Sequence, residues 1–136
     1  MNSNTKLLLA TSALFMGIVG VTFSFMPDEI LAFIHEGSSP LFVPVLKVVG
    51  ALYYGFAMIN WMSKGVIMGG IYARPLAVGN LAHYFIGAMA LIRHFDNADA
   101  YGAVYYAVTA IYILFAIFFG IAVFTHPLKQ TNGTAI

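Results

Sequence analysis

The sequence predicts an all-α, polytopic membrane protein: a four-transmembrane-helix bundle with a short amphipathic outer helix between the first two spans. Three observations lead to this prediction. Residues of the set AVILMFWYC make up 61% of the 136 residues and charged residues only 8%, whereas about a quarter of a soluble domain is charged. Four apolar windows are long enough to cross a bilayer. These windows do not alternate polar and apolar residues, as a half-buried strand would.

The predicted spans are residues 7–26, 41–62, 75–92 and 103–125, in one membrane domain that covers 1–136. A hydrocarbon layer about 30 Å thick needs about 20 helical residues that each rise 1.5 Å. Pro75 suits the first turn of the third helix, and Pro127 ends the fourth. Because Lys6 precedes the first window, a cleaved signal peptide is the alternative there, but the length of the window favours a span.

A short amphipathic helix is predicted at residues 28–36, in the loop after the first span. Asp28 and Glu29 favour a helix N-terminus, and Gly37 can end the segment. At 100° per residue, the side chains of Ile30, Leu31, Phe33 and Ile34 share one face, and the charged residues share the other. Such a helix lies in the membrane interface or caps the bundle.

The distribution of Lys and Arg predicts that both termini are cytoplasmic. In this orientation the inner segments hold Lys6, Lys64, Arg74 and Lys129, and the outer loops hold only Arg93. We therefore expect a multi-pass membrane protein with both termini on the inner side.

Charge and cysteine content exclude several functions. A net charge of +1 provides no basic surface, so nucleic acid is not an expected partner. The absence of cysteine excludes disulfides, thiolate metal sites and CxxC redox chemistry. The expected partners are the lipid bilayer and other membrane-protein subunits.

Six residues of the spans are candidate ligand-binding residues: Lys47, Tyr54, His83, Tyr105, Thr109 and Tyr112. Lys47 lies about 9 Å below the outer end of its span, given 1.5 Å per residue. It either lines a cavity, snorkels to the headgroups, or pairs with an outer acid such as Glu36. His83, near mid-membrane, either binds a ligand, relays a proton, or bonds to a neighbouring helix together with Asn80. The hydroxyl of Tyr112 needs a partner at depth.

These six side chains could line one chamber between the helices, open to the outer side. Aromatic walls with one cation and one imidazole suit a quinone or a lipid-like ligand. Bis-histidine haem is excluded because no second histidine lies at the depth of His83. No metal is assigned: solvated loop charges are the favoured interpretation of the outer group, which comprises Asp28, His35, Glu36, His94, Asp96 and Asp99.

The second span opens with the sequence LKVVGALY at residues 46–53, which resembles the opening of the second helix in DoxX-like proteins. These are small bacterial four-helix membrane proteins, and the chain is similar to them in length and number of spans. The resemblance matches Lys47 and Gly50 and transfers no catalytic residue. It implies a four-helix fold in a family that includes a subunit linked to quinone-dependent sulfur oxidation. The segment at residues 69–75 has no counterpart in that pattern.

The favoured hypothesis is a non-enzymatic accessory subunit or a binder of a lipophilic ligand. The alternative is a membrane oxidoreductase subunit with a quinone site around Lys47, His83 and Tyr112. A transporter fits less well, because a transport path shows more polar residues or broken helices at mid-membrane.

The predicted topology can be tested by cysteine labelling, since the parent chain has no cysteine. Cysteines introduced at Ser3, Ser63 and Thr134 are expected to resist an impermeant thiol reagent in intact cells, because they lie inside. A cysteine at Ser38 is expected to react. Labelling at Ser63 together with protection at Ser38 would contradict the topology.

Overall fold

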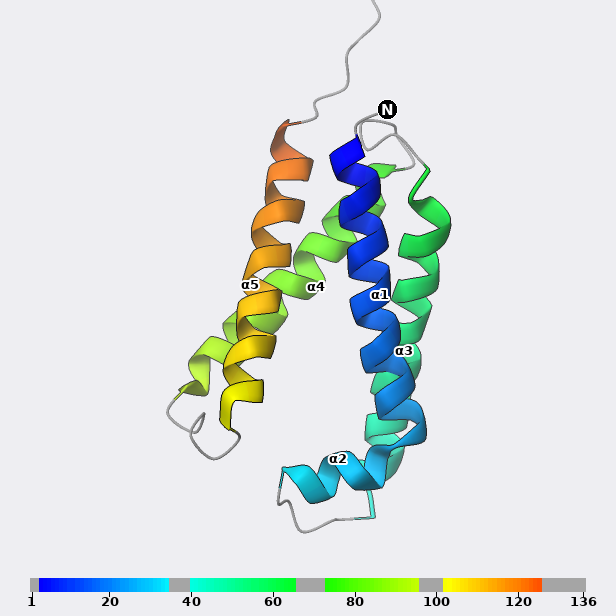
Figure 1. The fold of residues 1–136 in the computed structure, drawn as a ribbon, viewed down its shortest axis with the longest axis vertical. Coiled ribbons are helices and arrows are strands. Elements are labelled where there is room, and N and C mark those ends of the chain that lie inside the picture. Colours follow the sequence, from blue (N-terminus) through cyan, green and yellow to red (C-terminus); the bar gives the residue numbers. More distant parts are fainter. Residues whose placement is uncertain (1–2, 35–39, 66–72, 96–101, 126–136) are drawn as a thin grey trace, which may run out of the picture.

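The computed structural model describes residues 3–34, 40–65, 73–95 and 102–125, in which five helices and no strand occur (Figure 1). The helices are α1 (Ser3–Phe25), α2 (Pro27–Phe33), α3 (Phe42–Ser63), α4 (Ala73–Arg93) and α5 (Gly102–Thr125). The all-α prediction is confirmed. Four helices, α1, α3, α4 and α5, are long and apolar enough to cross a membrane. This is the architecture of an integral, multi-pass membrane protein.

The outward surface of the long helices is also that of a membrane protein. Large apolar side chains on each of them are more than half exposed, among them Leu14, Leu52, Ile86 and Phe124. A soluble monomer rarely exposes contiguous apolar surface on this scale. We therefore take these side chains to face lipid.

The short predicted helix is present as α2, which begins at Pro27 and has Asp28 and Glu29 in its first turn. It contacts α1 and α3 and lies across their ends (Figure 1). Leu31 is buried against the bundle, whereas Phe33 on the same predicted apolar face is 57% exposed. Residues 35 and 36 of the predicted segment lie outside the described residues.

Helices α1 and α3 run antiparallel and pack closely (Figure 1). Their backbones meet at Gly20 and Gly50. A Cβ atom at Gly20 would lie 2.7 Å from the Tyr54 nitrogen and 2.9 Å from the Gly50 oxygen. A Cβ at Gly50 would lie 2.7 Å from the Ser24 nitrogen. Only glycine permits this approach, as is common where membrane helices touch.

Helices α4 and α5 form the second antiparallel pair (Figure 1). Aromatic rings make contacts within the second pair and between the two pairs. The Tyr84 ring stacks on Phe115 with centroids 4.7 Å apart and on Phe119 at 5.8 Å. Phe15 of α1 contacts Phe115 at 6.0 Å. The core therefore depends on rings that reach from one helix pair to the other.

Candidate functional site

His83 of α4 lies in an aromatic cluster built from three helices. Its ring is 5.1 Å from Tyr53, 5.2 Å from Tyr84 and 5.8 Å from Tyr112, and it stacks on Phe56 at 5.6 Å, all between centroids. The side chain is half-buried. Its Nε2 atom is fully buried and has no hydrogen-bond partner among the described residues. A buried nitrogen without a partner is unfavourable, which singles out this atom as a candidate binding group.

The hydroxyls of Tyr53 and Tyr112 contact each other beside His83 and join α3 to α5. Tyr112 thus has the deep partner that its position requires. In such a pair only one hydroxyl donates to the other, so the second O–H is available to another acceptor. The Tyr112 ring also lies directly against Gly87, where any side chain would displace it. The cluster therefore leaves the buried Nε2 atom and one tyrosine proton without a hydrogen-bond partner among the residues that the structure describes.

Lys47 and Tyr54 do not join this cluster. They are seven residues apart on α3 and so share a face, and both are exposed. Tyr54 lines a groove of about 540 Å³ between α1 and α3, together with Met58 and Trp61. Tyr53, the neighbour that reaches the cluster, points about 100° away around the helix. The sequence prediction included Tyr54 and not Tyr53. Both tyrosines lie at similar depth in the membrane, and the sequence alone did not indicate which of these two adjacent positions faces the other helices.

Tyr105 and Thr109 have structural hydrogen bonds. The Tyr105 hydroxyl donates to the Leu91 carbonyl oxygen at 2.6 Å and thereby ties α5 to α4. The buried Thr109 hydroxyl donates to the Tyr105 carbonyl oxygen at 2.8 Å. Of the six predicted residues, the structure thus brings only His83 and Tyr112 into direct ring contact with each other.

A buried polar network that the sequence interpretation did not identify lies at the meeting of α1, α3 and α4. Asn60 and Asn80 exchange two hydrogen bonds, each Nδ2 donating to the other's Oδ1 at 2.7 Å. Asn60 also donates to Ser12 Oγ at 3.0 Å, and Asn80 to the Leu76 oxygen at 2.9 Å. Ser12 Oγ in turn shares a hydrogen bond of 2.8 Å with the Tyr84 hydroxyl. The hydrogen bonding to a neighbouring helix that was expected of Asn80 is therefore present, with Asn60 as the partner, and the second N–H of its amide donates to its own helix.

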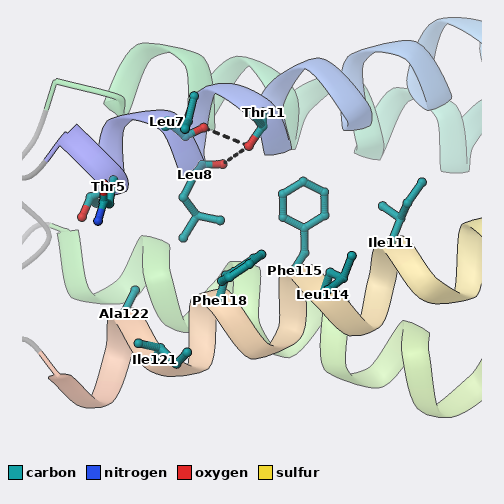
Figure 2. A pocket seen from close by; sticks show the side chains of 11 residues that line it. Thr5, Leu7, Leu8, Thr11, Ile111, Leu114, Phe115, Phe118, Ile121 and Ala122 are labelled. Atoms are coloured by element: carbon teal, nitrogen blue, oxygen red, sulfur yellow. Dashed lines mark hydrogen bonds between the residues drawn. The ribbon is translucent and has the colours of Figure 1, made fainter.

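A groove of about 720 Å³ lies between α1 and α5 (Figure 2). Its walls are mainly apolar, and Phe115 and Phe118 of α5 project into the space between the helices (Figure 2). Its polar lining residues, Asn4, Thr5 and Thr11, all belong to α1. The Thr11 hydroxyl is 2.9 Å from the Leu7 oxygen and 3.1 Å from the Leu8 oxygen, so its proton remains within its own helix. None of the six predicted residues lines this groove, because apolar residues give no sequence signal for a site.

The described residues contain no group of three His, Asp or Glu side chains that could hold a metal ion. Four of the outer residues considered for such a site, His35, Glu36, Asp96 and Asp99, lie outside the described residues.

Fold and grooves together define a small multi-pass α-helical membrane protein with an apolar groove between two spans and a tyrosine–histidine cluster in its core. Comparisons with protein-family models, with curated proteins and with solved structures find no match to this chain.

The amide pair can be tested with Asn60→Leu, Asn80→Leu and the double variant. Each single change leaves a buried amide without its partner, an effect of about 1–3 kcal/mol in proteins. We expect each single variant to have a lower melting temperature in detergent than the parent chain. The decrease in the double variant should be smaller than the sum of the two single decreases. Thr22→Val is the control, because that hydroxyl bonds only to Ile18 of its own helix. Additive losses would contradict direct pairing.

Proposed function

We propose that this protein is an integral membrane protein that binds a lipophilic ligand in the groove between α1 and α5. The groove volume of about 720 Å³ supports this function most directly, because ligand sites measure about 300–1,000 Å³. We also propose a bacterial inner membrane, cytoplasmic termini and a role as an accessory subunit that holds the ligand beside partner proteins.

The chemistry of the walls favours a hydrocarbon ligand. Leu8 of α1 and Phe118 of α5 point into the space between the two helices (Figure 2). Leu7, Leu114 and Ile121 also line the groove. Beyond the first turn of α1, the polar lining residue is Thr11, whose proton is directed to its own helix. A chain without hydrogen-bonding groups therefore fits the interior of the groove, and a polar molecule does not.

Thr11→Trp is expected to fill the groove and remove the ligand. Thr11 is exposed and bonds only to its own helix, so the folded bundle does not depend on it. Native mass spectrometry from mild detergent should show the mass of a bound lipophilic molecule on the parent chain and its loss from the variant. Val48→Trp is the control, since Val48 is exposed on α3 away from the groove. Equal retention by Thr11→Trp would contradict the proposal.

A second candidate function is that of an oxidoreductase subunit with a quinone site at the aromatic cluster. It is favoured by the buried Nε2 atom of His83 beside the hydroxyl pair of Tyr53 and Tyr112. An imidazole N–H and a tyrosine O–H are both donors suited to a quinone carbonyl oxygen. Lys47, which is exposed, is not part of this version of the site. The resemblance to DoxX-like proteins agrees with it.

This second function predicts that His83→Phe and Tyr53→Phe weaken the binding of a short-chain quinone added to the purified protein. Loss of one hydrogen bond of about 1.4 kcal/mol raises the Kd about tenfold. Tyr54→Phe is the matched control, because that tyrosine is half exposed outside the cluster. The change in Kd can be followed by titration with absorbance detection. An unchanged Kd in both cluster variants would reject the quinone site.

A further inference from the structure

We infer that the groove between α1 and α5 holds one acyl chain of an anionic phospholipid, with the headgroup at the end of the bundle where α1 begins. This inference rests on the proposed function and specifies its ligand. It depends on the length of the groove, on where its polar residues lie, and on the charge at that end of the bundle.

The groove spans about one leaflet. Along α5 its lining runs from Ile111 to Ala122, a rise of about 16 Å at 1.5 Å per residue. Half of a hydrocarbon core about 30 Å thick is about 15 Å. Thr5 of α1 lies at the Ala122 end and Ile111 at the other (Figure 2). A single chain that enters at Thr5 thus reaches mid-membrane near Ile111.

The groove is polar at one end and apolar along the rest of its length, which matches a molecule with a polar headgroup and a hydrocarbon chain. Asn4 and Thr5 are at the mouth, where an amide and a hydroxyl can contact a headgroup. The deeper wall consists of large apolar side chains such as Leu114 and Phe115. The hydroxyl of Thr11 adds no donor to it. The groove is therefore polar at one end and apolar over the rest.

Cations surround the end of the bundle that contains the mouth. Lys6 follows Thr5 on α1, Lys64 follows the last residue of α3, and Arg74 lies in the first turn of α4. These three helix ends lie at the same end of the bundle (Figure 1). Lys64 Nζ is 3.1 Å from the Trp61 ring centroid, as expected at a membrane surface. The acidic residues among those described both lie on α2, at the opposite end. An anionic headgroup complements this charge.

Other occupants fit the groove less well. A further transmembrane helix is about 10 Å wide with its side chains and packs closely where small residues line the contact. Here the walls carry Leu7, Leu114 and Phe118. A quinone with its ring at depth would need a polar partner there, and the groove offers none among the described residues beyond Thr11.

The test is competition between two lipids with identical acyl chains, phosphatidylglycerol and phosphatidylcholine, added in equal amounts to the full-length protein in mild detergent. Native mass spectrometry measures how much of each remains bound. We expect the parent chain to retain the anionic lipid about fivefold over the zwitterionic one, the ratio given by one cation near a membrane surface. A triple variant, Lys6→Gln, Lys64→Gln and Arg74→Gln, should retain the same total lipid at a ratio near one. Lys6→Gln alone should lower the ratio in part.

Two controls separate the possible failures. Arg93→Gln removes a cation from the opposite end of the bundle and should leave the ratio unchanged. Thr11→Trp should remove both lipids. Equal retention of the two lipids by the parent chain, a preference that survives the triple variant, or one that Arg93→Gln removes would overturn this inference while the proposed function stands. Undiminished binding of both lipids by Thr11→Trp would overturn the proposed function as well.

Discussion

The paired hydrogen bonds between Asn60 and Asn80 are the interaction on which the arrangement of the helices depends. Within each helix pair, α1 with α3 and α4 with α5, backbones approach closely. Between the pairs the link consists of side chains. Since lipid tails are as apolar as leucine, burial of apolar surface does not drive helices together in a membrane. The amide pair provides a directional attraction between α3 and α4 that apolar side chains do not.

The same network is connected to both candidate sites through Tyr84. Ser12 receives a hydrogen bond from Asn60 and shares another with the Tyr84 hydroxyl, which fixes the Tyr84 ring at the centre of the bundle. Phe115 stacks on one side of this ring and forms part of the groove wall. Tyr112 and His83 pack against Tyr84 edge-on and belong to the aromatic cluster. A change at the amide pair therefore reaches the groove and the cluster through Tyr84.

The sequence predicted the spans well because the thickness of the bilayer sets their length and composition directly. Which helices pack against each other was not predicted, since a helix that is apolar on every side has no polar face to indicate its orientation in the bundle. Tyr53 and Tyr54 illustrate the limit for the site: one position of difference places the first, half-buried, in the aromatic cluster and leaves the second exposed on another face of α3. Lys47 was the most conspicuous polar residue of the spans, yet its side chain is exposed. Asn60 was visible as a polar residue in a span, but its pairing with Asn80 depends on how α3 and α4 face each other.

The two candidate sites differ in what they would recognise. The groove offers length and apolar contact, and its polar lining residues Asn4 and Thr5 lie at the end of the bundle where Lys6, Lys64 and Arg74 also lie. The cluster offers hydrogen-bonding atoms within a packed set of rings, where the Nε2 atom of His83 is buried beside the Phe56 ring. Phe115 forms part of the groove wall and contacts Tyr84 of the core. A ligand chain pressing on Phe115 would act first on Tyr84 and then on its hydrogen bond to Ser12. Phe115 thus connects the wall of the groove to the hydrogen-bonded network between the two helix pairs.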